Sequence, residues 1–390
     1  MGDPPSGPPL AVDAEAGRVP GLSNPARAAL VVALLYLFLV GVSALETGIK
    51  ALGSGFQEGL LESVANPISG VFAGILATVL VQSSSVSTST IVGLVGAGTL
   101  TVGAAVPLIM GANIGTTVTN TLASLGSIRR PEEFKRAFAG ATVHDFFNLL
   151  AVLVLLPVEL TTGFLSRLAA ELADLLGRSE VRGAEASSPI KDAVKAPVKV
   201  VEAGLDAVTG ISTAIGIALL VFGLACIFVA LAYITRNMRE IVAGRVERAM
   251  NRIIGRGGGA VGIVVGVLVT IAVQSSSITT SILVPMVAAG VITLPNVFQI
   301  TLGANVGTTV TALLASLAVD RPEGLVIALV HTLFNVIGIA LVYPVPAVRM
   351  VPIRMARGMA ELAVRNRSLV TVYVVGLFVL LPLAGVALIQ

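Results

Sequence analysis

Two polar motifs occur twice in this chain at one spacing, and that duplication constrains the fold more than any other feature. The sequence VQSSS fills residues 81–85 and recurs at 273–277, while GANIGTTVT at 111–119 has a counterpart, GANVGTTVT, at 303–311. In each copy the Asn follows the Gln by 31 residues, and the two copies lie 192 residues apart. Two unrelated motifs repeated at a fixed spacing indicate that the chain contains two similar structural units.

A third match extends each unit. HDFFN at 144–148 corresponds to HTLFN at 331–335, and these copies are 187 residues apart because the connecting loop is shorter in the second unit. We therefore expect a first repeat over 27–178 and a second repeat over 211–366, joined by a solvated polar linker over 179–210.

Long apolar runs place both units in a membrane. Hydrophobic residues make up 55% of the chain and charged residues 12%, whereas charged residues are about a quarter of a soluble domain. Runs near 27–45, 134–157, 211–235 and 367–389 are each long enough to cross the roughly 30 Å hydrocarbon layer as a helix. The predicted fold class is an all-α polytopic membrane protein, with an extra C-terminal transmembrane helix over 367–390 that lies outside the repeat.

The segments around the QSSS motifs, 67–97 and 259–290, predict a different geometry. The helical piece on each side of the motif is too short to span, so we expect a re-entrant helical hairpin in each repeat. The segments 103–127 and 295–319 are expected to be helices broken at the GANxGTT motif. Three crossings then separate equivalent points of the repeats, which gives inverted topology and seven crossings in all.

Charge predicts the orientation. Basic residues concentrate in 127–136, 236–256 and 349–367, which this topology places on one side with the N-terminus. Under the positive-inside rule that side is cytoplasmic. We therefore expect a multi-pass protein of the cell membrane with a disordered cytoplasmic tail over 1–26, and we expect the linker over 179–210 to be extracellular.

Composition argues against a nucleic-acid partner and against sites built from several cysteines. Basic residues are not interleaved with aromatic residues, so nucleic acid is not an expected partner. The single Cys226 excludes an intrachain disulfide and a thiolate metal cluster.

The segments that carry the motifs contain no ionisable side chain. From Pro67 to Gly126 and from Gly259 to Val319 there is no Asp, Glu, Lys, Arg or His. A helix broken within the membrane exposes free N–H groups at one half, which attract anions, and free carbonyls at the other, which attract cations. QSSS adds a carboxamide and three hydroxyls at such a break, a set of groups that suits an oxyanion.

The Asn-x-Gly-Thr-Thr motif suits the complementary ion. Its Asn and Thr side chains offer oxygens to a hard cation such as Na⁺, and Gly115 and Gly307 are expected to let the backbone unwind. An anion held without Arg or Lys is costly by desolvation, so bound cations are expected to offset its charge. We expect the anion and the cation to need each other.

The remaining polar residues leave alternatives open. His144 and Asn148, like His331 and Asn335, lie on one helical face, and these pairs either respond to pH or pin two helices together. Asp145 has a Thr as its repeat partner and so stands outside the symmetric core. It either binds a cation or caps a neighbouring backbone.

These motifs resemble those of the type II sodium-dependent phosphate cotransporters. The duplicated VQSSS, the stretch GANIGTTVTN and the segment RAFAGATVHDFFNLLAVLVLLPVEL at 136–160 carry the resemblance, which is strongest over 67–160 and 259–345. It implies inward transport of inorganic phosphate driven by the Na⁺ gradient, with Na⁺ as coupling ion, no cofactor and a lipid bilayer as environment. The short central loop and the single Cys imply a reduced, bacterial member without the disulfide-bearing outer domain of the animal proteins.

The resemblance also implies which residues bind the two ions. Phosphate positions are Gln82, Ser83, Ser84, Ser85, Gln274, Ser275, Ser276 and Ser277. Sodium positions are Asn113, Thr116, Thr117, Asn305, Thr308 and Thr309, with Thr88 and Thr280 as additions. Na⁺ is the only metal ion expected.

Other functions stay open on the residues alone. A hydroxyl-rich site does not name its oxyanion, so Na⁺-coupled transport of sulfate or a dicarboxylate is the first alternative. An anion channel would show a continuous polar stripe or a charged ring, and the motif segments show neither. Enzymatic activity is not expected, because no nucleophile is paired with a base.

Overall fold

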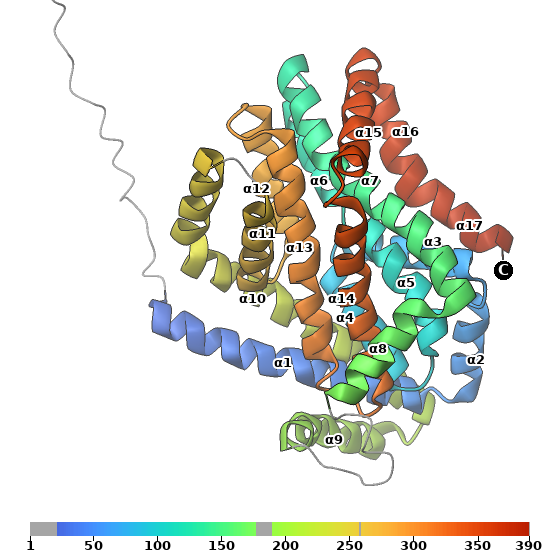
Figure 1. The fold of residues 1–390 in the computed structure, drawn as a ribbon. Helices are drawn as coiled ribbons and strands as arrows, with labels where there is room; N and C mark the ends of the chain where they lie inside the picture. The colour runs from blue at the N-terminus through green and yellow to red at the C-terminus, as the bar shows by residue number, and fades with distance from the viewer. Residues whose placement is uncertain (1–21, 177–188, 257–258, 390) are drawn as a thin grey trace, which may run out of the picture.

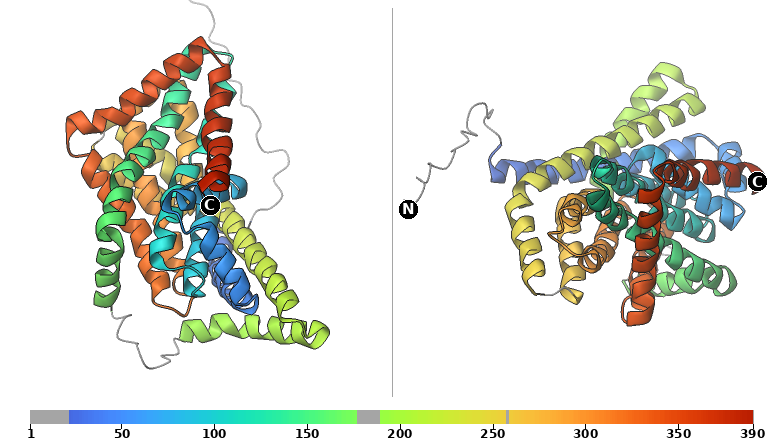
Figure 2. Two further views of the ribbon diagram at one scale, coloured as in Figure 1. Left: turned by 90° about the vertical axis from the view of Figure 1, so that its right-hand side faces the viewer. Right: turned by 90° about the horizontal axis from the view of Figure 1, so that it is seen from above.

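The computed structural model describes residues 22–176, 189–256 and 259–389, and in these ranges every secondary-structure element is a helix. Most of the expected N-terminal tail and the first part of the expected linker lie outside the described residues. The helices form one bundle, with α9 (Pro189–Thr209) at one end and α15 (Pro346–Arg365) at the opposite end (Figures 1 and 2).

Seven helical segments of the described residues are long and apolar enough to span a membrane. This agrees with the seven crossings predicted from the sequence and makes the chain a multi-pass membrane protein. The segments are α1 (Asn24–Ala51), α5 with α6 and η1 (Val102–Ser127), α7 (Pro131–Thr162), the first part of α10 (Ser212–Met238), α13 (Leu294–Ala315), α14 (Glu323–Val342), and α16 with η2 and α17 (Ser368–Ile389).

Short apolar helices flank both QSSS motifs, as predicted. In the first repeat α3 (Pro67–Val81) and α4 (Ser84–Gly96) meet at the motif, and α2 (Ser54–Ser63) precedes them. In the second repeat α11 (Ala260–Val273) and α12 (Ser276–Ala288) meet at the motif. None of these helices reaches the roughly 20 residues that a spanning helix needs.

The two GANxGTT segments differ, and one expectation is wrong. The first segment is interrupted, because α5 (Val102–Gly115) ends within the motif and α6 (Val118–Ser124) begins after it. In the second segment α13 (Leu294–Ala315) runs through the motif without a break. Gly307 serves close packing there, since a Cβ would lie 2.7 Å from Cβ of Thr270. A glycine permits a break in a helix but does not impose one.

Glycines also hold each QSSS helix against its GANxGTT helix. A Cβ on Gly111 of α5 would lie 2.0 Å from the carbonyl oxygen of Val71 in α3, and a Cβ on Gly303 of α13 would lie 1.9 Å from that of Ile263 in α11. Only glycine fits at such contacts, which bring two helix backbones together in a membrane protein. α3 with α5, and α11 with α13, are therefore tightly joined pairs.

Two helices, α10 and α9, go beyond what the sequence predicted, and a third, α8, agrees with it. The lead helix of the second repeat, expected to end near 235, continues to Arg256 as the long α10. α8 (Phe164–Leu175) is the amphipathic helix expected after the first repeat's last span. Residues 189–209, expected to be a solvated linker, form α9, which packs on α1 through a hydrogen bond from the Tyr36 hydroxyl to the carbonyl of Ala193 (2.8 Å).

The C-terminal helix packs on the first repeat. It consists of α16 (Ser368–Val375), a π-helical turn η2 (Gly376–Leu380) and α17 (Leu381–Ile389). Gly385 lies directly against the ring of Phe72 in α3, and Tyr373 reaches α7. This helix therefore contributes to the interior of the bundle although it lies outside the repeat.

Candidate functional site

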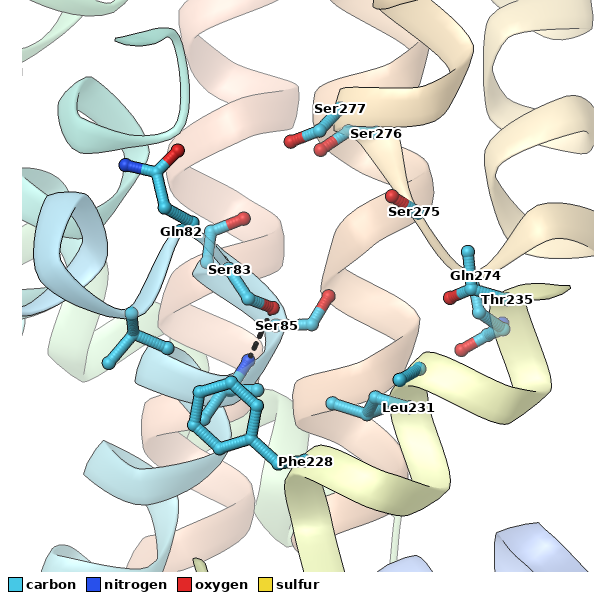
Figure 3. Close-up of a pocket in the computed structure, with 14 residues that line it drawn as sticks. Gln82, Ser83, Ser85, Phe228, Leu231, Thr235, Gln274, Ser275, Ser276 and Ser277 are labelled. Atoms are coloured by element: carbon cyan, nitrogen blue, oxygen red, sulfur yellow. Dashed lines mark hydrogen bonds between the residues drawn. The ribbon is translucent and has the colours of Figure 1, made fainter. Parts of the chain in front are cut away.

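Both QSSS motifs line one cavity. All eight residues of the two motifs border a space of about 230 Å³, together with Phe228, Leu231 and Thr235 of α10. Figure 3 shows the first motif on one side, the second motif on the other and the α10 side chains below them. The cavity thus brings together two segments that lie 192 residues apart in the chain.

Each motif makes the same sharp turn. Gln82 and Gln274 both have φ +55, and among the described residues they are the non-glycine residues in the left-handed region. This conformation costs about 1–2 kcal/mol for a residue with a side chain. It reverses the chain so that a new helix starts beside the cavity.

The first serine of each motif caps the helix that follows. The Ser83 hydroxyl accepts the backbone N–H of Val86 (3.3 Å) at the start of α4, and Ser275 does the same for Ile278 (3.3 Å) at the start of α12. A cap of this kind contributes about 1 kcal/mol to helix stability. These two hydroxyls are therefore engaged in the fold.

The other serines keep their hydroxyls available. Ser84 and Ser85 of α4, like Ser276 and Ser277 of α12, line the cavity, and their hydroxyls bond to no other group among the described residues. Backbone N–H groups in the first turn of a helix lack an intrahelical acceptor. Two helix N-termini and four hydroxyls are thus directed at one uncharged space, which carries the partial positive potential of both helix dipoles.

The glutamine amides are bonded elsewhere. Nε2 of Gln82 donates to the carbonyl of Val79 (2.5 Å), and Oε1 accepts the hydroxyl of Thr119 (3.2 Å). In the second repeat Nε2 of Gln274 donates to the carbonyl of Ile271 (2.7 Å), and Oε1 accepts the hydroxyl of Thr311 (3.2 Å). The sequence interpretation missed both threonines, although each is the last residue of its GANxGTTVT motif.

Thr235 was also missed, because it belongs to no repeated motif. It lies on α10, borders the cavity and has no hydrogen-bond partner among the described residues. Figure 3 places it at the side of the cavity where Gln274 lies. Only the folded structure identifies it as a fifth free hydroxyl.

The predicted sodium and histidine positions form one buried network. His144 donates from Nε2 to Oδ1 of Asn305 (2.5 Å), and Nδ2 of Asn305 donates to Oδ1 of Asn148 (2.8 Å). Asn148 in turn donates to the carbonyl of Asn113 (2.7 Å), whose side-chain oxygen accepts Nδ2 of Asn335 (3.2 Å). The network joins α5, α7, α13 and α14, and its members are at most 5% exposed.

His331 takes a different place from His144. Nδ1 is buried without a hydrogen-bond partner in both histidines, but Nε2 of His144 bonds to Asn305, whereas the oxygen of Asn113, the repeat equivalent of Asn305, accepts Nδ2 of Asn335. The Oδ1 of Asn335 is unpaired, while that of Asn148 accepts Nδ2 of Asn305. The network is therefore not symmetric between the two repeats.

The predicted sodium threonines are bonded within their own helices. The hydroxyls of Thr116, Thr117, Thr308 and Thr309 donate to backbone carbonyls three or four residues earlier, and Thr88 donates to the carbonyl of Ser85 (3.4 Å). Each hydroxyl oxygen retains lone pairs after donating. These positions can therefore still coordinate a cation.

Thr280 makes a contact between the repeats. Its hydroxyl lies 2.9 Å from Oδ1 of Asn120 on α6, a buried residue that the sequence interpretation missed. Position 312 is the repeat equivalent of Asn120 and holds an alanine, so the duplication gave no signal.

Asp145 lies in the core with one oxygen unpaired. The hydroxyl of Tyr373 donates to Oδ2 (2.6 Å), while Oδ1 is buried without a hydrogen-bond partner. The Thr117 side chain neighbours the same carboxylate. Asp145 is 2% exposed, so its charge is almost entirely removed from solvent.

Fold and cavity together define a class of protein: a polytopic helical membrane protein with a polar interior site built from two similar halves, features shared by secondary transporters. The family comparison is more specific. The chain matches the family described as Na⁺/Pi-cotransporter over residues 37–166 and 226–348, and it belongs to that family.

Curated relatives agree with this assignment. The chain is 34% identical to sodium-dependent phosphate transport protein 2A of Ovis aries, over 96% of this chain and 70% of that protein. It is 32% identical to the 2A protein of Rattus norvegicus (90% and 66%) and 33% identical to the 2B protein of Homo sapiens (92% and 64%). The chain thus spans about two thirds of the length of these relatives. No solved structure matches the chain.

Proposed function

We propose that this protein is a secondary active transporter that imports inorganic phosphate together with Na⁺. The observation that carries the proposal is the cavity between the two QSSS motifs, where the starts of α4 and α12 meet with four unbonded serine hydroxyls. Family membership and the names of the relatives support phosphate and Na⁺ as the transported ions. Transport rather than enzymatic chemistry is the activity that these relatives' names describe.

Phosphate would be held by hydrogen bonds and helix dipoles. Its oxygens accept several short hydrogen bonds, and hydrogen bonds to a charged group contribute about 1.5–3 kcal/mol each. Ser84, Ser85, Ser276 and Ser277 supply the hydroxyls, and the first-turn N–H groups of both helices supply further donors. Among the described residues no charged side chain lines the cavity, so the bound anion needs a countercharge from elsewhere.

Na⁺ would supply that countercharge. We assign its ligands among the oxygens of Asn113, Asn305 and the threonines of the same motifs, listed above from the sequence. The Asp145 carboxyl, which Thr117 neighbours, has its Oδ1 buried without a hydrogen-bond partner and so offers an oxygen that a cation could coordinate. This favours the cation alternative for Asp145 over a backbone cap.

We place the N-terminus in the cytoplasm of a cell whose plasma membrane holds the protein. The basic segments at 127–136 and on α15 lie at one end of the bundle, where Lys135 pairs with Glu361 (3.0 Å). Glu46 and Asp320 lie together at the other end, bridged by Lys50. This asymmetry supports a cytoplasmic basic end by the positive-inside rule, with the two QSSS hairpins re-entrant from opposite sides.

The test is uptake of radiolabelled phosphate into proteoliposomes under an inward Na⁺ gradient, with K⁺ replacing Na⁺ as control. Uptake that requires Na⁺ and is lost in a Ser85→Ala, Ser277→Ala double variant is the expected result. Folded protein without Na⁺-dependent phosphate uptake would refute the proposal. Unlabelled sulfate and succinate are added as competitors. Inhibition of phosphate uptake by either anion, at a concentration equal to that of phosphate, would show that the site does not select phosphate over that anion.

A further inference from the structure

The two motif glutamines use their amides in the same way, although they lie in different repeats. Each donates from Nε2 to a carbonyl three residues earlier and accepts a threonine hydroxyl on Oε1, at 3.2 Å in both cases. An accidental side-chain contact would not be expected to recur at both positions with the same partners. We propose that Gln82 and Gln274 are clasps that hold the turns, and that Thr119 and Thr311 are the positioning residues that hold the clasps.

The backbone conformation explains why a clasp is needed. Both glutamines have φ +55, a region that glycine enters freely and that a residue with a side chain enters at a cost. Glycine would make the turn easily, so a glutamine here is explained by what its amide does. The amide bonds to the helix before the turn through Nε2 and to a threonine of the GANxGTT segment through Oε1.

The threonines come from the segments that carry the other motif. Thr119 lies on α6, and Thr311 lies on α13. Each clasp therefore joins the start of a cavity-facing helix, α4 or α12, to the GANxGTT segment of the same repeat. The clasp fixes where the first-turn N–H groups and the free serine hydroxyls point.

Each amide uses its oxygen and one of its two N–H donors in the clasp, so its main role in this arrangement is to hold the turn. Gln82 is exposed, whereas Ser84 and Ser85 are buried. The inference rests on the proposed function for its phosphate readout. It revises the sequence expectation that both glutamines bind the anion directly.

The experiment is a double-mutant cycle between Thr119 and Gln82, read out by phosphate KM in proteoliposomes. Thr119→Val keeps the shape of the side chain and removes the hydroxyl, and Gln82→Gly keeps the turn and removes the amide. We expect each variant to raise KM about fivefold, the loss of one ordinary hydrogen bond, and the double variant to be no worse than Gln82→Gly alone. Thr119→Ser should behave as the wild type, and Thr161→Val, at an exposed site on α7, is the matched control.

Gln82→Gly raising KM while Thr119→Val leaves it unchanged would overturn the clasp and make Gln82 a phosphate ligand. The cycle is repeated with Thr311→Val and Gln274→Gly, so that a folding defect in one repeat does not decide the result. Full additivity in both cycles would also overturn the proposal.

A second measurement does not depend on phosphate. Hydrogen exchange of the full chain in nanodiscs reports on the amides of residues 83–87, which follow the clasp. Thr119→Val should make them exchange at least threefold faster, with Thr161→Val unchanged. If the wild type fails to transport phosphate but exchange still rises, the proposed function fails and the clasp stands; unchanged exchange overturns the clasp.

Discussion

Nε2 of His144 lies 2.5 Å from Oδ1 of Asn305, and this hydrogen bond joins residues 161 positions apart in the two repeats. His144 is 1% exposed and Asn305 is 3% exposed, so the bond lies in the core. Of the two interpretations open for the His-x-x-x-Asn pairs, this contact favours helix pinning for His144. Asn305 is at once part of that pin and a proposed sodium ligand.

Asn305→Ala should therefore reduce both stability and Na⁺ activation. The change leaves Nε2 of His144 and Oδ1 of Asn148 without partners, and each unpaired buried group costs about 1–3 kcal/mol. Thermal unfolding in detergent and the Na⁺ dependence of phosphate uptake measure the two effects. The control is Asn237→Ala, which removes one bond within α10. An unchanged melting temperature would show that the network does not stabilise the fold.

Two neighbouring serines should respond differently to the same substitution. Ser83→Ala removes the cap of α4 and should lower stability by about 1 kcal/mol. Ser85→Ala removes a hydroxyl that has no hydrogen-bond partner in the described part of the chain and should raise phosphate KM roughly tenfold or more at unchanged stability. Melting temperature and uptake kinetics are measured on both variants. A lower melting temperature for Ser85→Ala, or a higher phosphate KM for Ser83→Ala alone, would contradict the assignment of Ser83 to capping and Ser85 to binding.

Thr235→Val should weaken phosphate binding although Thr235 lies outside every repeated motif. Its hydroxyl borders the cavity without a protein partner, so valine removes a donor and keeps the shape. We expect phosphate KM to rise about fivefold or more, with Thr235→Ser close to the wild type. Thr213→Val, at an exposed site near the start of α10, is the control. Equal KM values for the two valine variants would remove Thr235 from the site.

Asp320 should link the stability of the α9 end of the bundle to pH. Partial burial acts to raise the pKa of this carboxyl, but the hydrogen bond and charge of Lys195, with the charges of Lys50 and Lys191, hold the pKa below its usual value. A carboxyl with a lowered pKa stabilises the fold above its ordinary pKa of about 4, and that contribution is lost as the pH falls through the lowered value.

Asp320→Asn should accordingly lower stability at pH 7 and have a shrinking effect below about pH 4. Because the Asp320 side chain is 37% exposed, solvent screens the pairs and the loss should stay under about 1 kcal/mol. Unfolding of both proteins is followed from pH 3 to pH 8. A difference that grows on acidification would have the wrong sign for this pairing.

The helices and the meeting of the QSSS motifs followed from the sequence, because both depend on local or repeated signals. Apolar runs fixed the seven spanning segments, and Gln-Ser at each break combines a chain reversal with an N-cap. The spacing indicated two similar units, and the family resemblance assigned the phosphate positions to both breaks. The cavity lined by both motifs agrees with that expectation.

Residues without a repeat partner escaped detection. Asn120 faces Thr280 across the two repeats, but its equivalent position holds an alanine. Thr235 borders the cavity because α10 passes beside both QSSS motifs. The docking of α9 depends on pairs such as Lys195 with Asp320 (2.5 Å), which join residues distant in sequence. Periodicity and motif spacing do not report such tertiary contacts.

The glycine contacts between α3 and α5, and between α11 and α13, limit how this molecule can move. Gly111 touches the backbone of Val71, and Gly303 touches that of Ile263, so neither pair can slide without a clash. Each pair should travel as a rigid body that carries the QSSS turn and the asparagine of one repeat together. The distance between anion and cation would then stay constant while the barrier to solvent shifts from one side of them to the other. The movement would then take place where these bodies meet the remaining helices, such as α10 beside the cavity.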